Sequence, residues 1–295
     1  MLNKIISLKD KLKLDQASRR KLAEWLIKNV LMILALTAVA SIILIVVFIW
    51  REGWPILARV GVLNYIFGAE WQPYAGKFGA LPLIIGSLYV TLGALLWAVP
   101  LGLGCAIFMA YLAPKYMARI LQPAISLLAG IPSVVYGFFG LVVIGFYVAE
   151  IFHNTGLTLL TGAIILGIMI LPNIISISED ALRAVPREYI EGSLAMGATM
   201  WQTICRVLLK AARNGIIAAV ILGMGRALGE TMAVLMVTGS RPVIPKSILE
   251  PGATLTGSIG QDMSYAAGDH RVALFANGIL LFLFIVVLNS LALVL

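Results

Sequence analysis

Residues 215–239 read GIIAAVILGMGRALGETMAVLMVTG, an apolar stretch interrupted by a single arginine and a single glutamate. A helix of about 20 apolar residues crosses a bilayer, so this stretch is long enough to do so. Arg226 and Glu230 lie near its middle, where a charge costs roughly 2.5–3.5 kcal/mol. Their spacing of four residues places both on one face of the predicted helix. We therefore expect that face to contact protein or water rather than lipid.

The rest of the chain is equally apolar. Of its 295 residues 61% are hydrophobic and 12% are charged, and the mean hydropathy is +0.99. Soluble domains do not have this composition, so we expect an all-α, polytopic membrane protein. Six apolar runs predict six transmembrane helices, at about 29–50, 80–113, 121–149, 157–177, 215–238 and 273–295.

The basic residues are distributed unevenly between the loops. With the N-terminus in the cytosol, the cytoplasmic segments hold 15 of the 22 Lys and Arg, including the eight in residues 1–30. This asymmetry follows the positive-inside rule and predicts a cytoplasmic N-terminus. The net charge of +8 therefore reflects topology, and we expect no nucleic-acid partner.

The predicted order of segments starts with a cytoplasmic amphipathic segment at 1–28, the first transmembrane helix at 29–50 and an extracytoplasmic loop at 51–79. Residues 80–295 form a core of five further transmembrane helices, with a long cytoplasmic loop at 178–214. Within this core, Pro132 should break the third helix, because proline removes a helix hydrogen bond. The cytoplasmic loop reads as two helical pieces, about 179–195 and 200–213, separated near Gly197.

Motifs for catalysis are missing. The chain contains no GxxxxGK[ST] phosphate-binding loop, no HExxH, no GxSxG and no Cys or His spacing typical of a metal site. We expect no catalytic residue, no metal and no cofactor, and hence a transport subunit rather than an enzyme.

The cytoplasmic loop carries the most specific pattern. A short helix with small residues and a glycine turn at its end can dock in a cleft of another protein and transmit rigid-body motion. The loop resembles the EAA loop of ABC importer permeases at Glu191, Gly192, Ser193, Gly197 and Leu209. Gly192 and Ser193 stand in place of two alanines, and Lys210 stands in place of the final proline. The resemblance implies the type I permease fold and contact of this segment with a separate ATPase. An amphipathic helix resting on the membrane is the alternative.

Three further segments narrow the resemblance. The chain is similar to the permeases of Pst-type phosphate importers at residues 78–82 (FGALP), 129–140 (AGIPSVVYGFFG) and 226–239 (RALGETMAVLMVTG). The Met-Ala-Val after Gly-Glu-Thr resembles PstC subunits, whereas PstA subunits typically carry Ala-Pro-Leu there. The family implies a heterodimer with a PstA-like second permease, a dimer of cytosolic ATP-binding subunits, and an extracytoplasmic phosphate-binding protein. It also implies a bacterial inner membrane, with lipid around the helices.

Within this frame the residues of the fifth helix have expected roles. Gly225 and Gly229 have the GxxxG spacing that lets two helices approach closely. Arg226 is expected to contact a passing phosphate and Glu230 to neutralise the arginine when phosphate is absent. A purely structural ion pair is the alternative. Ser133 and Tyr136, next to Pro132, either line the same path or pack helices together.

The expected function is a phosphate-translocating permease subunit of an ATP-driven importer. Two alternatives remain open from the residues. One is a permease for another oxyanion such as phosphonate, sulfate or molybdate, because a single Arg–Glu pair does not distinguish tetrahedral anions. The other is a secondary anion carrier driven by protons through Glu230.

Overall fold

The computed structural model describes the backbone of residues 2–294, and side chains at Lys21 and from Glu24 to Ser290. The chain divides into two compact units, residues 1–51 and 52–295. The first unit is helical throughout its described length and belongs to α1 (Leu2–Val60). Its described part from Glu24 onward is long and apolar enough to cross a membrane. The predicted amphipathic face of residues 1–28 lies mostly outside the described side chains.

The predicted loop at 51–79 is largely ordered structure. Helix α1 continues past residue 50 to Val60, and a short α2 (Val62–Phe67) follows. Strands β1 (Trp71–Gln72) and β2 (Lys77–Phe78) then form an antiparallel ribbon around η1 (Pro73–Ala75). Gly53 lies so close to Phe275 and Ala276 that an added Cβ would meet Ala276 N at 2.7 Å. The helix therefore extends beyond its predicted end because its last turns pack within the second unit.

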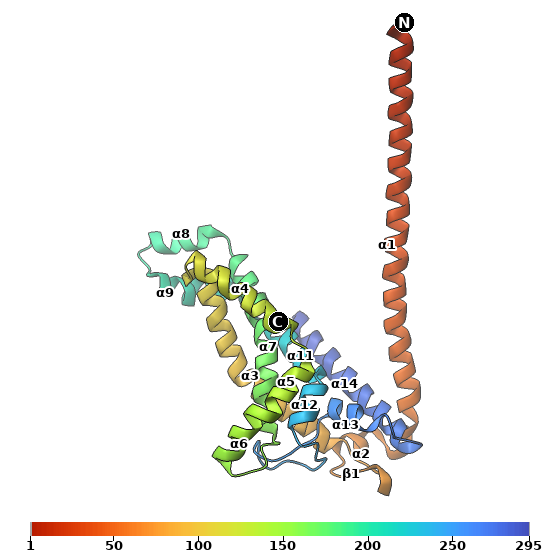
Figure 1. The fold of residues 1–295 in the computed structure, drawn as a ribbon, viewed down its shortest axis with the longest axis vertical. Helices are drawn as coiled ribbons and strands as arrows, with labels where there is room; N and C mark the ends of the chain where they lie inside the picture. The colour runs from red at the N-terminus through yellow and green to blue at the C-terminus, as the bar shows by residue number, and fades with distance from the viewer. Residues whose placement is uncertain (1, 295) are drawn as a thin grey trace. The chain divides into compact units, whose positions relative to one another are not determined.

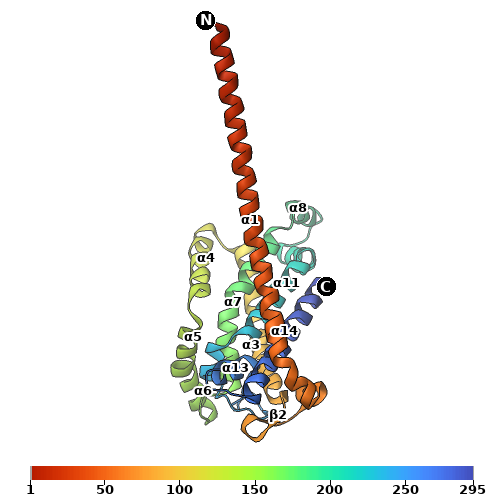
Figure 2. The same cartoon turned by 90° about the vertical axis from the view of Figure 1, so that its right-hand side faces the viewer.

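The second unit is built almost entirely from helices, with α8 and α9 at one end and β1 and β2 at the other (Figures 1 and 2). The helices are α3 (Leu81–Ile107) with the π-turn η2 (Phe108–Leu112), α4 (Lys115–Gly130), α5 (Ser133–Phe139), η3 (Gly140–Ile144), α6 (Gly145–Phe152), α7 (Leu159–Arg183), α8 (Arg187–Ala195), α9 (Met200–Thr203), η4 (Ile204–Leu208), α10 (Leu209–Ala211), α11 (Arg213–Gly229), α12 (Met232–Val237), α13 (Leu255–Asp262) and α14 (Asp269–Val294).

Helices α3 and α7 form the centre of this unit. A buried cluster joins Val90, Ala94 and Ala98 of α3 to α7, α11 and α12. The contact is close because glycines face the neighbouring helix: a Cβ on Gly167 would lie 2.3 Å from the Trp97 ring. Small residues at helix contacts are typical of membrane proteins, where packing rather than the hydrophobic effect drives association.

Five helices of the described chain are long and apolar enough to cross a membrane, and a sixth span results if the bent pair Met200–Ala211 and Arg213–Gly229 is counted as one. The predicted break at Pro132 is confirmed, since α4 ends at Gly130 and α5 begins at Ser133. The chain is thus a multi-pass membrane protein. The fifth predicted helix differs from the expectation and is described below.

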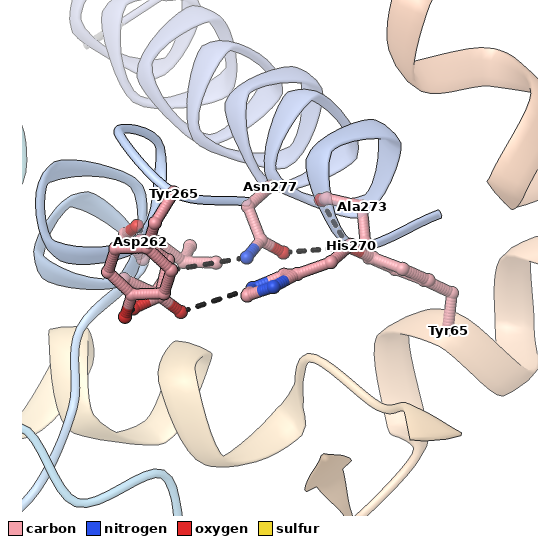
Figure 3. A network of polar contacts seen from close by, with 8 residues as sticks. Tyr65, Asp262, Tyr265, His270, Ala273 and Asn277 are labelled. Carbon is pink, nitrogen blue, oxygen red and sulfur yellow. Dashed lines mark hydrogen bonds and ion pairs between the residues drawn. The ribbon is translucent and has the colours of Figure 1, made fainter. Parts of the chain in front are cut away.

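Two small polar networks hold the end of the unit near β1 and β2 (Figure 3). The Tyr65 hydroxyl lies 2.7 Å from Ala273 O and 2.9 Å from Asn277 Oδ1, which ties α2 to α14. In the other network Asp262 Oδ2 lies 3.2 Å from His270 Nε2, and Tyr265 donates a hydrogen bond to Asp262 Oδ1. That hydrogen bond to the carboxylate, with burial and the charge of Asp262, raises the pKa of Tyr265 to about 12, so the phenol stays a donor.

Candidate functional site

The fifth predicted helix is broken at its centre. Helix α11 ends at Gly229, Glu230 is extended (φ −71°, ψ 130°), and α12 begins at Met232. The expectation of one continuous helix at 215–238, with Arg226 and Glu230 on one face, is therefore wrong. The change of backbone direction at Glu230 removes the helical register between the two side chains.

The groups freed by this break find partners nearby. Glu230 Oε1 accepts a hydrogen bond from Ala233 N at 3.3 Å, near the start of α12. The Thr256 hydroxyl donates to the Glu230 carbonyl at 2.8 Å. Broken helices are tolerated at membrane depth where protein or a water-filled cavity satisfies the backbone, and transporters place their substrate paths at such breaks.

Arg226 has a different partner from the one expected. Its Nη1 donates to Asn173 Oδ1 of α7 at 3.1 Å, and the pair is exposed. Among the ion pairs of the described residues, none joins Arg226 to Glu230. A guanidinium has five N–H donors, so the neutral amide of Asn173 orients Arg226 while leaving its charge and most of its donors available.

The two glycines beside Arg226 face open space. A Cβ added at Gly225 or Gly229 would meet nothing within 4 Å, whereas Gly223 faces Ile174 at 3.1 Å. Their role in helix packing is therefore not fulfilled within the described chain. It stays a prediction for a second permease subunit.

The residues at the helix break between α4 and α5 differ in burial. Tyr136 is buried against Ile165, Met169 and Ala233, and its hydroxyl donates to Leu128 O at 2.8 Å. Ser133 is half-buried and Pro132 is exposed at the start of α5. Tyr136 thus joins α4 to α5 and packs helices, while Ser133 remains a candidate for the path.

A hydroxyl-lined cavity beside Glu230 was not expected from the sequence. Its polar lining comes from Ser87 and Thr91 of α3 and from Thr254 and Thr256. Its volume of about 10 Å³ is close to what a single water molecule needs. Asn173 was also missed. The sequence signal for Asn173 and for the two α3 hydroxyls was a polar side chain inside an apolar run, which also occurs where helices merely pack. The two threonines from residues 254–256 lie in the predicted extracytoplasmic loop.

The cytoplasmic loop forms a projecting helical hairpin. Helix α8 has no buried residue among those described, and Glu191 and Gly192 are exposed. Ser193 Oγ lies 2.9 Å from Thr203 Oγ1, which fixes α8 against the following helix, and Leu209 packs against a small core at the base.

Gly197 makes the turn of this hairpin with φ +83°. Only glycine adopts this conformation without strain. Next to it, the Met196 side chain is 88% exposed. An exposed apolar tip on a rigid turn has the properties of a docking surface for another protein.

No group of three or more His, Cys, Asp or Glu in the described residues is arranged to hold a metal ion.

Comparisons with known proteins place these features in context. Residues 98–295 match the family described as "Binding-protein-dependent transport system inner membrane component". A Bacillus subtilis protein named "Probable ABC transporter permease protein YqgH" is 42% identical, covering 88% of this chain and 87% of that protein. Proteins named "Phosphate transport system permease protein PstC" from Mesorhizobium japonicum and Haemophilus influenzae are 36% and 32% identical, covering 84% and 88% of both chains in each pair. Among solved structures, an inward-facing crystal form of the MetNI methionine ABC transporter aligns with a TM-score of 0.57 at 20% identity, covering 70% of this chain and 89% of that one.

Proposed function

Because this chain belongs to the family of binding-protein-dependent transport system inner membrane components, we propose that it is the membrane-spanning permease subunit of an ATP-driven importer of inorganic phosphate. The similarity to permeases named for phosphate transport, over 84% of the chain and more, supports this substrate. The fold is that of a type I ABC permease. The subunit moves phosphate and is not itself an enzyme; ATP is hydrolysed on a partner chain.

The observation that carries the proposal is the exposed Arg226, held by the neutral Asn173 at the break of the fifth helix. A phosphate oxyanion entering between this chain and a second permease meets a guanidinium with free donors, which bind an oxyanion in bidentate geometry. Because Asn173 carries no charge, phosphate does not have to displace a carboxylate. The contact is transient, since a tight resident site would slow release.

Glu230 has a structural part in this account. Its carboxylate accepts a hydrogen bond near the start of α12 and thereby holds the helix break that places Arg226. A carrier driven by protons needs a carboxylate that loads and releases a proton during each cycle, and a carboxylate committed to holding a helix end is poorly suited to that task.

Coupling to ATP runs through the hairpin of α8 and α9. Its exposed tip around Met196 and Gly197 meets a cytosolic ATP-binding subunit dimer, and the motion of that dimer reaches α7 and α11 through the base of the hairpin. A PstA-like second permease covers Gly225 and Gly229, and a phosphate-binding protein delivers substrate to the end that carries β1 and β2. In this arrangement the N-terminus is cytoplasmic.

Reconstitution tests the proposal. The full complex in proteoliposomes should take up radiolabelled phosphate only with ATP and binding protein. This chain alone should show no uptake driven by a pH gradient. Competition by sulfate, molybdate or phosphonate should be weak when the phosphate-binding protein is present. Equal uptake of another oxyanion would assign the permease to that anion, and proton-driven uptake by the single chain would refute ATP-driven import.

A further inference from the structure

A groove of about 570 Å³ lies at the base of the α8–α9 hairpin and has no part in the function proposed above. Its walls come from the last turn of α7, the start of α8 with Tyr189, and the segment η4–α10. Helix α7 ends at Arg183 and α11 begins at Arg213, so the groove lies where the spans leave the apolar part of the membrane.

Arg206 and Lys210 are the two charged side chains that line the groove, and no carboxylate lines it. Both are exposed, and neither has an ion pair or side-chain hydrogen bond in the part of the chain that the structure describes. Three basic residues elsewhere do have a carboxylate partner: Arg59 pairs with Asp269, Lys77 with Glu70, and Arg183 with Glu179. Two cations without a counter-ion in one groove make it a site for an anion.

The remaining lining is mostly apolar. Val185, Pro186 and Val207 contribute to the walls, together with small side chains of α7 and α10. Inorganic phosphate or another small hydrated anion would leave these walls without a partner. A molecule with an anionic head and an apolar body satisfies both parts. Basic pockets between helices at the cytoplasmic side of a membrane are known to bind lipid head groups.

We propose that this groove binds one anionic phospholipid, with its phosphate between Arg206 and Lys210 and its glycerol backbone and the beginning of an acyl chain along the apolar walls. The lipid then fills the space between the start of α8, the end of α7 and the segment η4–α10. Lipid binding here does not depend on which anion the permease transports.

Lipid retention tests the proposal directly. The full-length chain, expressed with its partner subunits, is incubated with vesicles of phosphatidylcholine containing phosphatidylglycerol and extracted in mild detergent. The phosphatidylglycerol that remains bound per protein is then measured by mass spectrometry. R206Q/K210Q should bind phosphatidylglycerol roughly thirtyfold more weakly, which is about 2 kcal/mol for two cations near an anionic surface. Its retention of phosphatidylcholine should not change.

Three comparisons make the result decisive. R206K/K210R keeps both charges and should retain the lipid. K115Q/R119Q removes two exposed cations from α4, outside the groove, and should bind like the wild type. Equal loss of lipid in K115Q/R119Q would show that general surface charge causes the effect and would overturn the proposal. Unchanged binding in R206Q/K210Q, or lost binding in R206K/K210R, would also overturn it. Displacement of phosphatidylglycerol by millimolar inorganic phosphate would identify free phosphate as the occupant and refute the lipid site.

Discussion

At the scale of single residues, the two charged residues of the fifth predicted helix have different roles. Arg226 is oriented by Asn173 and keeps its charge exposed, while Glu230 forms a hydrogen bond near the start of α12. The structure places Arg226 in the last turn of α11 and Glu230 in the break that follows, not at the centre of one continuous helix as the sequence predicted. The sequence did not disclose their partners, because the i,i+4 spacing implies a shared face only while the helix continues, and the break at Glu230 depends on Thr256 from a distant segment.

Two substitutions at Glu230 separate its charge from its hydrogen bond. E230Q keeps an oxygen that accepts from Ala233 N, so phosphate uptake and thermal stability should stay close to the wild-type values. E230A removes the acceptor and should lower the free energy of unfolding by about 1 kcal/mol, as the loss of a helix cap does, with a clear loss of uptake. Uptake and thermal unfolding of the purified complex measure both effects. Loss of uptake in E230Q equal to that in E230A would assign the function to the negative charge instead.

At the scale of elements, the α8–α9 hairpin shows what sequence patterns convey well. Two helical pieces separated near Gly197 were predicted, at about 179–195 and 200–213. The structure has α8, a turn with Gly197 at φ +83°, and α9, but α8 begins only at Arg187, and residues up to Arg183 still belong to α7. Glycine turns and helix starts are local signals. The end of α1 was misplaced by the same local reasoning, because its extension to Val60 depends on packing of Gly53 against α14, which no local pattern reveals.

Gly197 provides a test at this scale. G197V should cost about 1–2 kcal/mol through the left-handed backbone and should tilt the exposed tip of the hairpin. We expect ATP hydrolysis by the assembled complex to continue without phosphate uptake, because the tip no longer transmits motion.

Gly268 supplies the matched control for this substitution. It also has a positive φ (+56°) and open space around it, but it lies just before α14. G268V should cost similar stability and leave transport coupled to ATP. Equal uncoupling in both variants, or normal uptake in G197V, would contradict a specific role of the hairpin.

At the scale of the whole molecule, the second unit is a layer of helices around α3 and α7 whose two ends have different character. One end carries the hairpin of α8 and α9, and the other carries β1, β2 and the polar networks (Figure 1). Six spans were predicted, and five helices qualify, with a sixth if the bent pair is counted as one. They were predictable because apolar runs of sufficient length have few other uses. The network of Tyr65 was not predictable, since it joins residues more than 200 positions apart, Tyr65 and Asn277.

Tyr65 tests how much these networks stabilise the fold. Its hydroxyl is buried between Ala273 O and Asn277 Oδ1, and burial raises the pKa of the phenol, so it donates throughout the physiological range. Y65F removes this buried donor, so that Asn277 Oδ1 loses the Tyr65 hydroxyl as its partner, and should reduce the free energy of unfolding by about 1–3 kcal/mol. Y74F is the control, because Tyr74 is 86% exposed and keeps its ring contact with His270 as phenylalanine. Thermal unfolding in detergent measures the stability of both variants. Equal stability of the two would show that this network does not stabilise the fold.

The central claim, that Arg226 contacts phosphate on its path through an ATP-driven importer, is tested most directly by uptake in proteoliposomes containing the full complex with R226Q or R226K. Loss of the cation removes about 1.5–3 kcal/mol of charge-assisted hydrogen bonding, so R226Q should slow ATP-dependent phosphate uptake by roughly ten- to a hundredfold. R226K, which keeps the charge but not the fork geometry, should retain an intermediate rate. ATP hydrolysis and assembly with the partner subunits should persist in both variants. Wild-type phosphate uptake by R226Q would contradict the account.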